Sequence, residues 1–290
     1  MEIYWLILVA APEGVRFIYE RHPDVEIRLQ RKTPGGQWSA PQSVATGIQN
    51  DTLRYPTWNP VIFQPDGGEL MLYYKVGPSP KEWWGEYITS ADNGYTWSSP
   101  RRVGLPLLGP IKNKPIQLAD GTILLAYQRR WKKGYNDLDH TNENCYIEIM
   151  SSADGGASWT DPRRIYTGRC WEPAMLQLPS GEIQMYITDS NEVKYKRSQP
   201  CTTLIRSFDG GRTWQGKEHC TYKDGEIISR TIDSRGSYDG MASAVRLDDG
   251  SLLLPVEVWS GVHKMDQTPV IIKTDAATNW RSDQSIRDNG

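Results

Sequence analysis

The chain has 290 residues, of which 38% are hydrophobic and 23% charged, so it is long enough for a sizeable core and its composition argues against disorder. Its 33 basic and 35 acidic residues give a net charge of −2, which provides no electrostatic reason to expect nucleic acid or an anionic membrane as partner. With 12 Trp and 15 Tyr against 3 Phe, and with 26 Gly and 19 Pro, the composition indicates a turn-rich β protein.

No segment is apolar over the roughly 18 residues that a membrane-spanning helix needs. The apolar start, residues 1–11, lacks the positive charge that precedes the core of a secretory signal, so we do not expect a signal peptide there. The four cysteines show no C-x-x-C spacing and the four histidines are scattered, so we expect neither a metal site nor a cofactor. Cys201 and Cys220 flank the turn at residues 209–214, which leaves a disulfide and two free thiols equally open.

An internal repeat runs through the chain from its first module to its last. A degraded copy stands at residues 31–38, intact copies of S-x-D-x-G-x-[T/S]-W stand at 90–97, 152–159 and 207–214, and a second degraded copy stands at 273–280. Successive copies are about 60 residues apart, the length of one structural module. Asp in such a turn can accept backbone N–H bonds, Gly supplies the unusual φ, and Trp can pack between sheets, so we expect these segments to be structural.

A second repeat lies between these boxes and consists of a tight turn followed by an apolar strand. The turns stand at residues 12–14, 66–67, 120–121, 180–181 and 249–250, and examples of the strands are 69–74, 122–127 and 251–254. Acidic or small residues followed by Gly favour hairpin turns. Each module therefore holds two hairpins, or four strands, which is the content of one propeller blade.

The boxes resemble the Asp-box, or bacterial neuraminidase repeat, and over nearly its whole length the chain resembles the sialidase superfamily. The resemblance implies an all-β fold, one sialidase-like β-propeller domain over residues 1–290 with four-stranded blades. Five modules are visible, so either the propeller has five blades or it is a truncated or atypical six-bladed form, which we favour. The resemblance also implies a monomer that is secreted or periplasmic and acts on a glycan or polysaccharide.

Sialidases bind the substrate carboxylate with three arginines and use an Asp acid/base and a Tyr nucleophile paired with a Glu. Arg21 and Asp24 resemble the first Arg and the Asp, although an exposed ion pair at a strand entry explains them equally well. Glu172 resembles the Glu partner, but Ile187, Thr188 and Asp189 stand where a further Arg is expected. The segment for the nucleophilic Tyr would lie past residue 290. A sialidase in the strict sense is therefore the second choice.

The exo-α-1,5-L-arabinanase branch resembles the second half better, because one of its two catalytic glutamates lies in a Trp-Glu-Pro segment and the other ends a strand that follows an Asp-Gly-Met segment. Glu172 stands in Trp171-Glu172-Pro173, and Glu257 ends the strand that follows Tyr238-Asp239-Gly240-Met241. The resemblance makes these glutamates the carboxylate pair and places Trp171, Tyr238 and Asp239 near the substrate. Structural roles, such as a salt bridge at a strand end, remain the alternative for both glutamates. Glycosidases need one ionised and one protonated carboxyl group, so two such residues suit the reaction.

Two further segments occupy the same module position as Trp171-Glu172-Pro173. They are residues 55–60, with Trp58 as a stacking surface for a sugar ring, and residues 109–115, in which Lys112, Asn113 and Lys114 could bind hydroxyl or carboxylate groups. From register, symmetry would bring all three segments to one end of the propeller axis.

The sequence thus predicts an exo-acting, metal-independent glycoside hydrolase that removes terminal sugars by a retaining paired-glutamate mechanism. The alternatives are an exo-α-sialidase and a propeller without catalytic activity that binds glycans or a protein.

Overall fold

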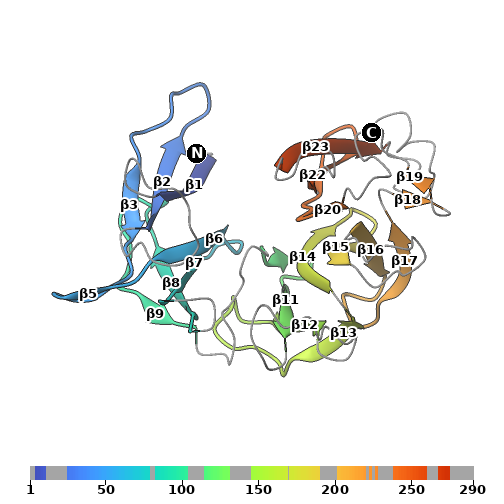
Figure 1. Ribbon diagram of the computed structural model, residues 1–290, viewed down its shortest axis with the longest axis horizontal. Coiled ribbons are helices and arrows are strands. Elements are labelled where there is room, and N and C mark those ends of the chain that lie inside the picture. The colour runs from blue at the N-terminus through green and yellow to red at the C-terminus, as the bar shows by residue number, and fades with distance from the viewer. Residues whose placement is uncertain are drawn as a thin grey trace. The chain divides into compact units, whose positions relative to one another are not determined.

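The computed structural model in Figure 1 describes most of the chain, and all regular structure in the described part is β. The described residues are 4–10, 25–78, 82–103, 114–130, 145–168, 170–189, 201–219, 222–223, 226–227, 238–259 and 267–274. The chain divides into two compact units, with the described strands up to residue 114 in the first and those from residue 115 in the second.

The first unit contains two antiparallel sheets and one hairpin (Figure 1). One sheet has the order β1-β2-β3, and the other has the order β6-β7-β8-β9. The strands are β1 (Tyr4–Ala10), β2 (Glu26–Lys32), β3 (Gln42–Ala45), β6 (Thr57–Phe63), β7 (Leu70–Val76), β8 (Trp84–Ser90) and β9 (Arg101–Arg102), with the hairpin β4 (Ile48–Asn50) and β5 (Leu53–Arg54) between the sheets in sequence.

The second unit contains three antiparallel sheets of four strands and a short pair, β18 (Tyr222–Lys223) with β19 (Glu226–Ile227). The first sheet is β10 (Ile116–Gln117), β11 (Ile123–Arg130), β12 (Cys145–Ser152) and β13 (Arg163–Thr167). The next is β14 (Cys170–Gln177), β15 (Ile183–Asp189), β16 (Cys201–Ser207) and β17 (Gln215–His219). In the last, β20 (Tyr238–Gly240) and β21 (Val245–Arg246) both pair with β22 (Leu252–Trp259), which also pairs with β23 (Gln267–Thr274).

The predicted module of two hairpins is confirmed in the three sheets that begin with β6, β10 and β14. In each of them a tight turn joins the first two strands and a box joins the last two. Gly121 and Gly181 in these tight turns have φ of 85° and 87°, as the sequence predicts for hairpin glycines. The first module differs, because three strands of its sheet lie among the described residues. Its predicted turn at residues 12–14 lies outside the described residues.

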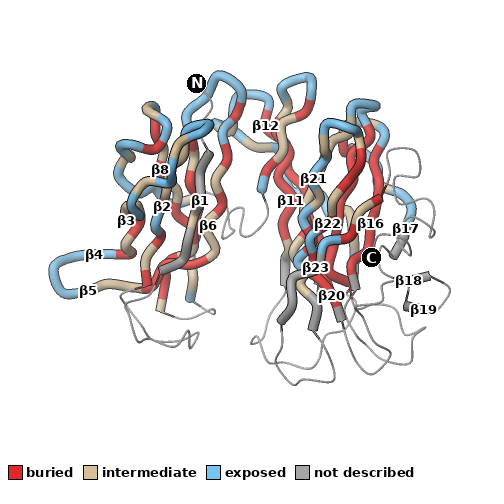
Figure 2. Tube along the Cα trace, turned by 90° about the horizontal axis from the view of Figure 1, so that it is seen from above, coloured by how far each residue is buried: buried red, intermediate tan, exposed pale blue. Residues whose placement is uncertain are grey.

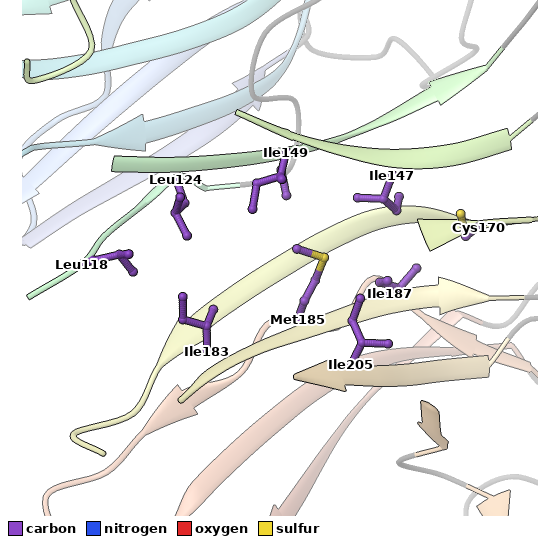
Figure 3. Packing of buried hydrophobic residues seen from close by; sticks show 10 residues of the cluster. Leu118, Leu124, Ile147, Ile149, Cys170, Ile183, Met185, Ile187 and Ile205 are labelled. Carbon is purple, nitrogen blue, oxygen red and sulfur yellow. The ribbon is translucent and has the colours of Figure 1, made fainter. Parts of the chain in front are cut away.

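The core of the second unit is an apolar layer between two successive sheets. Figure 3 shows Leu124, Ile147 and Ile149 of the β10–β13 sheet facing Ile183 and Met185 of the next sheet. Figure 2 shows the buried positions concentrated along the central strands of the unit. Burial of each such side chain contributes about 1.5–3 kcal/mol. Alternation of these residues along the strands explains why the segments form sheets that are covered on their faces.

The three intact boxes fold into the same hydrogen-bonded turn, which agrees with their predicted structural role. In the first box, Ser90 Oγ accepts the Gly94 N–H at 2.7 Å, and Asp92 Oδ1 accepts the Thr96 N–H at 2.8 Å. Trp97 Nε1 donates to the Gly94 carbonyl oxygen at 3.1 Å, and its ring packs against the core of the first unit. The corresponding bonds recur at residues 152–159 and 207–214.

Candidate functional site

The predicted site residues fall into three groups. Trp58 and Lys114 lie in the first unit, where Trp58 is 9% exposed and Lys114 is exposed. Five candidates lie in the second unit, namely Trp171, Glu172, Tyr238, Asp239 and Glu257. The remaining four candidates, Arg21, Asp24, Lys112 and Asn113, fall outside the residues that the structure describes.

Glu172 has the most unusual backbone among the candidates. Its φ is 56°, in the left-handed region that residues with a side chain seldom adopt. The register between β14 and β15 shifts between Trp171 and Ala174, so Glu172 and Pro173 form a β-bulge. The side chain is half-buried, and its Oε2 atom is shielded from solvent. Backbone strain of this kind costs about 1–3 kcal/mol and is concentrated at functional sites, which makes Glu172 the strongest candidate.

The same conformation recurs in two other sheets, within the first strand of one and directly after the first strand of the other. Asn59 in β6 has φ 49° and, like Glu172, stands between Trp and Pro in a bulge. Met241, immediately after β20, has φ 55°. The sequence comparison of Trp58-Asn59-Pro60 with Trp171-Glu172-Pro173 therefore identified a real structural equivalence. It did not identify Met241, which has neither neighbour.

Glu257 occupies the second strand of its sheet, directly opposite Gly240. It is half-buried and alternates along β22 with the buried residues Leu254 and Val256, so it lies on the other face of that strand. Glu172 and Glu257 thus lie on different sheets of one unit. Glu172 has a left-handed backbone itself, and Glu257 is opposite the residue that precedes one.

Asp239 makes a contact that links two sheets. It is fully buried, and its Oδ1 atom accepts a hydrogen bond of 2.8 Å from the backbone N–H of Thr202 in β16. This bond satisfies a carboxylate inside the protein, where an unpaired charge would be expensive. The backbone of Tyr238 pairs with Trp259 next to it.

The positions where the sialidase pattern expects an arginine are buried and already hydrogen-bonded. Asp189 is 1% exposed, and its Oδ2 atom accepts a hydrogen bond of 2.6 Å from the hydroxyl of Tyr166. Thr188 Oγ1 accepts a hydrogen bond of 2.9 Å from the Met241 N–H. Asp189 and Thr188 therefore form hydrogen bonds within the protein where the sialidase pattern has an arginine.

Sequence reasoning missed Lys75 and Trp83, which lie near the bulge at Asn59. Lys75 is opposite Trp58 in the β6–β7 pair, and its Nζ atom lies 4.4 Å from the ring centroid of Trp83. A cation over a Trp face is a stabilising arrangement. Lys75, Thr188 and Glu257 occupy equivalent register positions in their three sheets. Each is paired with the residue that directly precedes a left-handed position, namely Trp58, Trp171 and Gly240. Only the strand register, which the sequence does not contain, reveals this equivalence.

Within the described part of the chain, no group of three or more His, Cys, Asp or Glu side chains is arranged to hold a metal ion. The described residues also include no helix of the length and apolarity needed to cross a membrane.

Comparison with solved structures shows the fold. A protein of unknown function from Dyadobacter fermentans is 14% identical, with a TM-score of 0.65 over 96% of this chain and 77% of that one. An alpha-L-arabinanase from Penicillium chrysogenum, complexed with arabinobiose, is 17% identical, with a TM-score of 0.53 over 75% of this chain and 62% of that one. The NanB sialidase from Streptococcus pneumoniae is 12% identical, with a TM-score of 0.57 over 93% of this chain and 56% of that one.

These likenesses define the class: the fold is that of the sialidase-like β-propellers. The chain spans less than two thirds of the length of the arabinanase and of the sialidase. No curated protein matches the sequence. The family model for the BNR repeat-like domain matches residues 8–146 and 141–290, and the chain belongs to this family.

Proposed function

We propose that the chain is an exo-acting glycoside hydrolase that removes terminal sugars from a glycan or polysaccharide. The observation that carries the proposal is the backbone of Glu172, because a carboxylate is held at a strained left-handed position within a bulge. The Glu172 side chain is half-buried with its Oε2 atom shielded from solvent, which does not suit a carboxylate placed there for solubility. The fold shared with an arabinanase and with sialidases supports the same class of reaction.

Glu172 and Glu257 are the proposed pair of carboxylates, and Trp171 is the proposed contact for the sugar ring. In the retaining reaction, one carboxylate attacks the anomeric carbon while the other carboxylic acid donates its proton to the departing oxygen. Water then attacks the glycosyl ester and gives its proton to the second carboxylate. The sugar leaves with a new hydroxyl group, and both side chains return to their initial states. This route requires the two carboxyl groups to be about 5–5.5 Å apart when substrate is bound.

The test is hydrolysis of a panel of chromogenic glycosides, together with debranched arabinan and a sialoside, by the wild type and Glu172→Gln. The matched control is Glu69→Gln, which alters an exposed carboxylate in the turn before β7. We expect release of a terminal sugar by the wild type and by the control, and a loss of at least about 100-fold in Glu172→Gln. Equal rates for both variants would contradict the proposed role of Glu172.

Two other functions are separated by the same panel. Cleavage of the sialoside alone would favour an exo-α-sialidase, a candidate that rests on the fold shared with sialidases. Sugar binding without hydrolysis by the wild type, measured by calorimetry on the same oligosaccharides, would favour a propeller that binds glycans. In that case Glu172→Gln has no hydrolysis rate to change. It should alter the measured affinity for the sugar if Glu172 contacts it.

A further inference from the structure

Thr188 links the two segments that carry the proposed carboxylate pair. It is 3% exposed in β15, and its register partner in β14 is Trp171, the neighbour of Glu172. Its Oγ1 atom accepts a hydrogen bond of 2.9 Å from the backbone N–H of Met241, in the sheet that contains Glu257. One hydroxyl group therefore connects the β14–β17 sheet, beside the Glu172 bulge, to the segment that follows β20.

The approach of the two segments at this point is unusually close. A methyl group at Gly240 would lie 2.7 Å from both Oγ1 and Cγ2 of Thr188, a distance that non-bonded carbon atoms do not reach. Gly240 is not among the glycines with positive φ, so space rather than backbone conformation explains the glycine at this position. Gly240 is also the register partner of Glu257. Any change in the Thr188 contact therefore acts directly on the strand pair that carries Glu257.

We propose that Thr188 is a positioning residue that fixes the distance between the backbone carrying Glu172 and the backbone carrying Glu257. The inference rests on the function proposed above and names a determinant of its geometry. Spacing matters because carboxyl groups about 5–5.5 Å apart allow direct attack, whereas groups about 6.5–9.5 Å apart leave room for water. A misplacement of about 1 Å lowers rates roughly 100-fold in well-ordered sites.

The chain offers a matched control on the neighbouring strand. Thr202 in β16 is the register partner of Thr188 and is fully buried. Among the described residues, its hydroxyl oxygen has no hydrogen-bond partner, although its backbone N–H binds Asp239. Replacing Thr202 by Val removes a buried hydroxyl group of the same type in the same sheet without removing a bond between sheets.

The experiment compares Thr188→Val, Thr188→Ser and Thr202→Val by kcat and KM, on the glycoside of the panel that the wild type hydrolyses best. We expect kcat to fall about 10- to 100-fold in Thr188→Val with KM changed less than about twofold, because binding groups remain while the reacting groups move apart. Thr188→Ser keeps the oxygen and should restore kcat to within about threefold of the wild type. Thr202→Val should match the wild type.

Several outcomes would overturn the inference. With an active wild type, an unchanged kcat in folded Thr188→Val, or equal losses in Thr188→Val and Thr202→Val, would contradict positioning by Thr188 while leaving the proposed function intact. Absence of hydrolysis by the wild type would overturn both. If Thr188→Val does not fold, Gly240→Ala replaces it, because the added methyl group separates the same segments and should lower kcat in the same way.

Discussion

The guanidinium group of Arg163 in β13 donates a hydrogen bond of 2.5 Å to the carbonyl oxygen of Gly211, in the box turn of the following sheet. A second bond of 2.6 Å goes to the carbonyl oxygen of Arg212. The first unit repeats the arrangement, since Arg31 in β2 donates to the carbonyl oxygen of Gly94 in the box of its next sheet. An arginine from one sheet thus binds the box of the next at two places in the chain.

We therefore expect Arg163→Lys to destabilise the protein although it keeps the charge. A lysine cannot donate two bonds in the fixed geometry of a guanidinium, so at least one carbonyl contact is lost. The expected loss is about 1 kcal/mol in the free energy of unfolding, less than is usual for a charged hydrogen bond because the side chain is exposed. Urea denaturation measures it. Full stability in Arg163→Lys would show that the contact contributes nothing to the packing of the two sheets.

Acid should weaken the box turns over the pH range between the ordinary pKa of an aspartate and the lower pKa of the box aspartates. Hydrogen bonds from Ser and Thr side chains and backbone N–H groups lower the pKa of Asp92, Asp154 and Asp209 from the ordinary 3.8 to about 2. A pKa that is lower in the folded state gives stability that is fully present above about pH 4 and is lost as the pH falls toward 2. Denaturation at pH 4, 3 and 2 should show this decline.

Asp154→Asn tests the origin of that pH dependence. It should lower the free energy of unfolding at pH 7, since an amide cannot accept the same bonds as a carboxylate, and should reduce the decline between pH 4 and 2. Asp51→Asn, at an exposed turn between β4 and β5, is the control. Identical pH dependence in Asp154→Asn and the wild type would contradict the assignment.

Strain at Glu172 predicts opposite effects on stability and on activity. Glu172→Gly removes the unfavourable contacts of a side chain at φ 56°, so the free energy of unfolding should rise by up to about 1 kcal/mol. Hydrolysis should be abolished, because the carboxylate is gone. Thermal denaturation and the glycoside assay on the same sample measure both effects.

Asn59→Gly is the matched stability variant, with φ 49° at the equivalent position. Its gain should be smaller, because Asn adopts left-handed backbone more readily than Glu. A loss of stability in both glycine variants would show that the bulges are not strained.

A buried Tyr–Glu pair occurs twice at the same register. Tyr127 in β11 donates its hydroxyl to Glu148 Oε2 at 2.8 Å, and Tyr74 in β7 donates to Glu86 Oε2 at 3.2 Å. Burial and then the Glu86 carboxylate raise the pKa of Tyr74 above its ordinary value, so it remains a donor at all working pH values. Each pair joins directly opposed residues of neighbouring strands.

Tyr127→Phe should therefore lower the free energy of unfolding by about 1–3 kcal/mol, because a buried carboxylate loses a hydroxyl donor. Tyr95→Phe, at an exposed residue of the first intact box, should change it by less than about 0.5 kcal/mol. Differential scanning calorimetry distinguishes the two. A shift of the same size in both variants would mean that the Tyr127 hydroxyl has no special role.

The sequence predicted the features that are local in the chain. The boxes and the hairpin turns at Gly121 and Gly181 are encoded within a few residues, since turn chemistry depends on neighbouring side chains and on φ. The all-β class and the repeated module follow from these turns.

What the sequence did not reveal depends on register between distant strands. Thr188 and Met241 are 53 residues apart, and Arg163 and Gly211 are 48 residues apart. The Tyr–Glu pairs escaped notice because their partners are separated by 12 residues in one sheet and 21 in the other. Because the loops between the paired strands differ in length, the Tyr–Glu pair does not recur at a constant spacing in the sequence, although it recurs at the same register in the two sheets.

The left-handed positions within or directly after the first strands of three sheets have a consequence for how chemistry varies on this fold. Asn59, Glu172 and Met241 share one backbone conformation but carry an amide, a carboxylate and a thioether. The left-handed backbone therefore occurs with three different side chains, so we expect that one substitution can exchange the functional group without altering the path of the chain. At these three positions the backbone fold and the chemical group can change independently. This permits proteins of one fold to act on different substrates while they keep the same architecture.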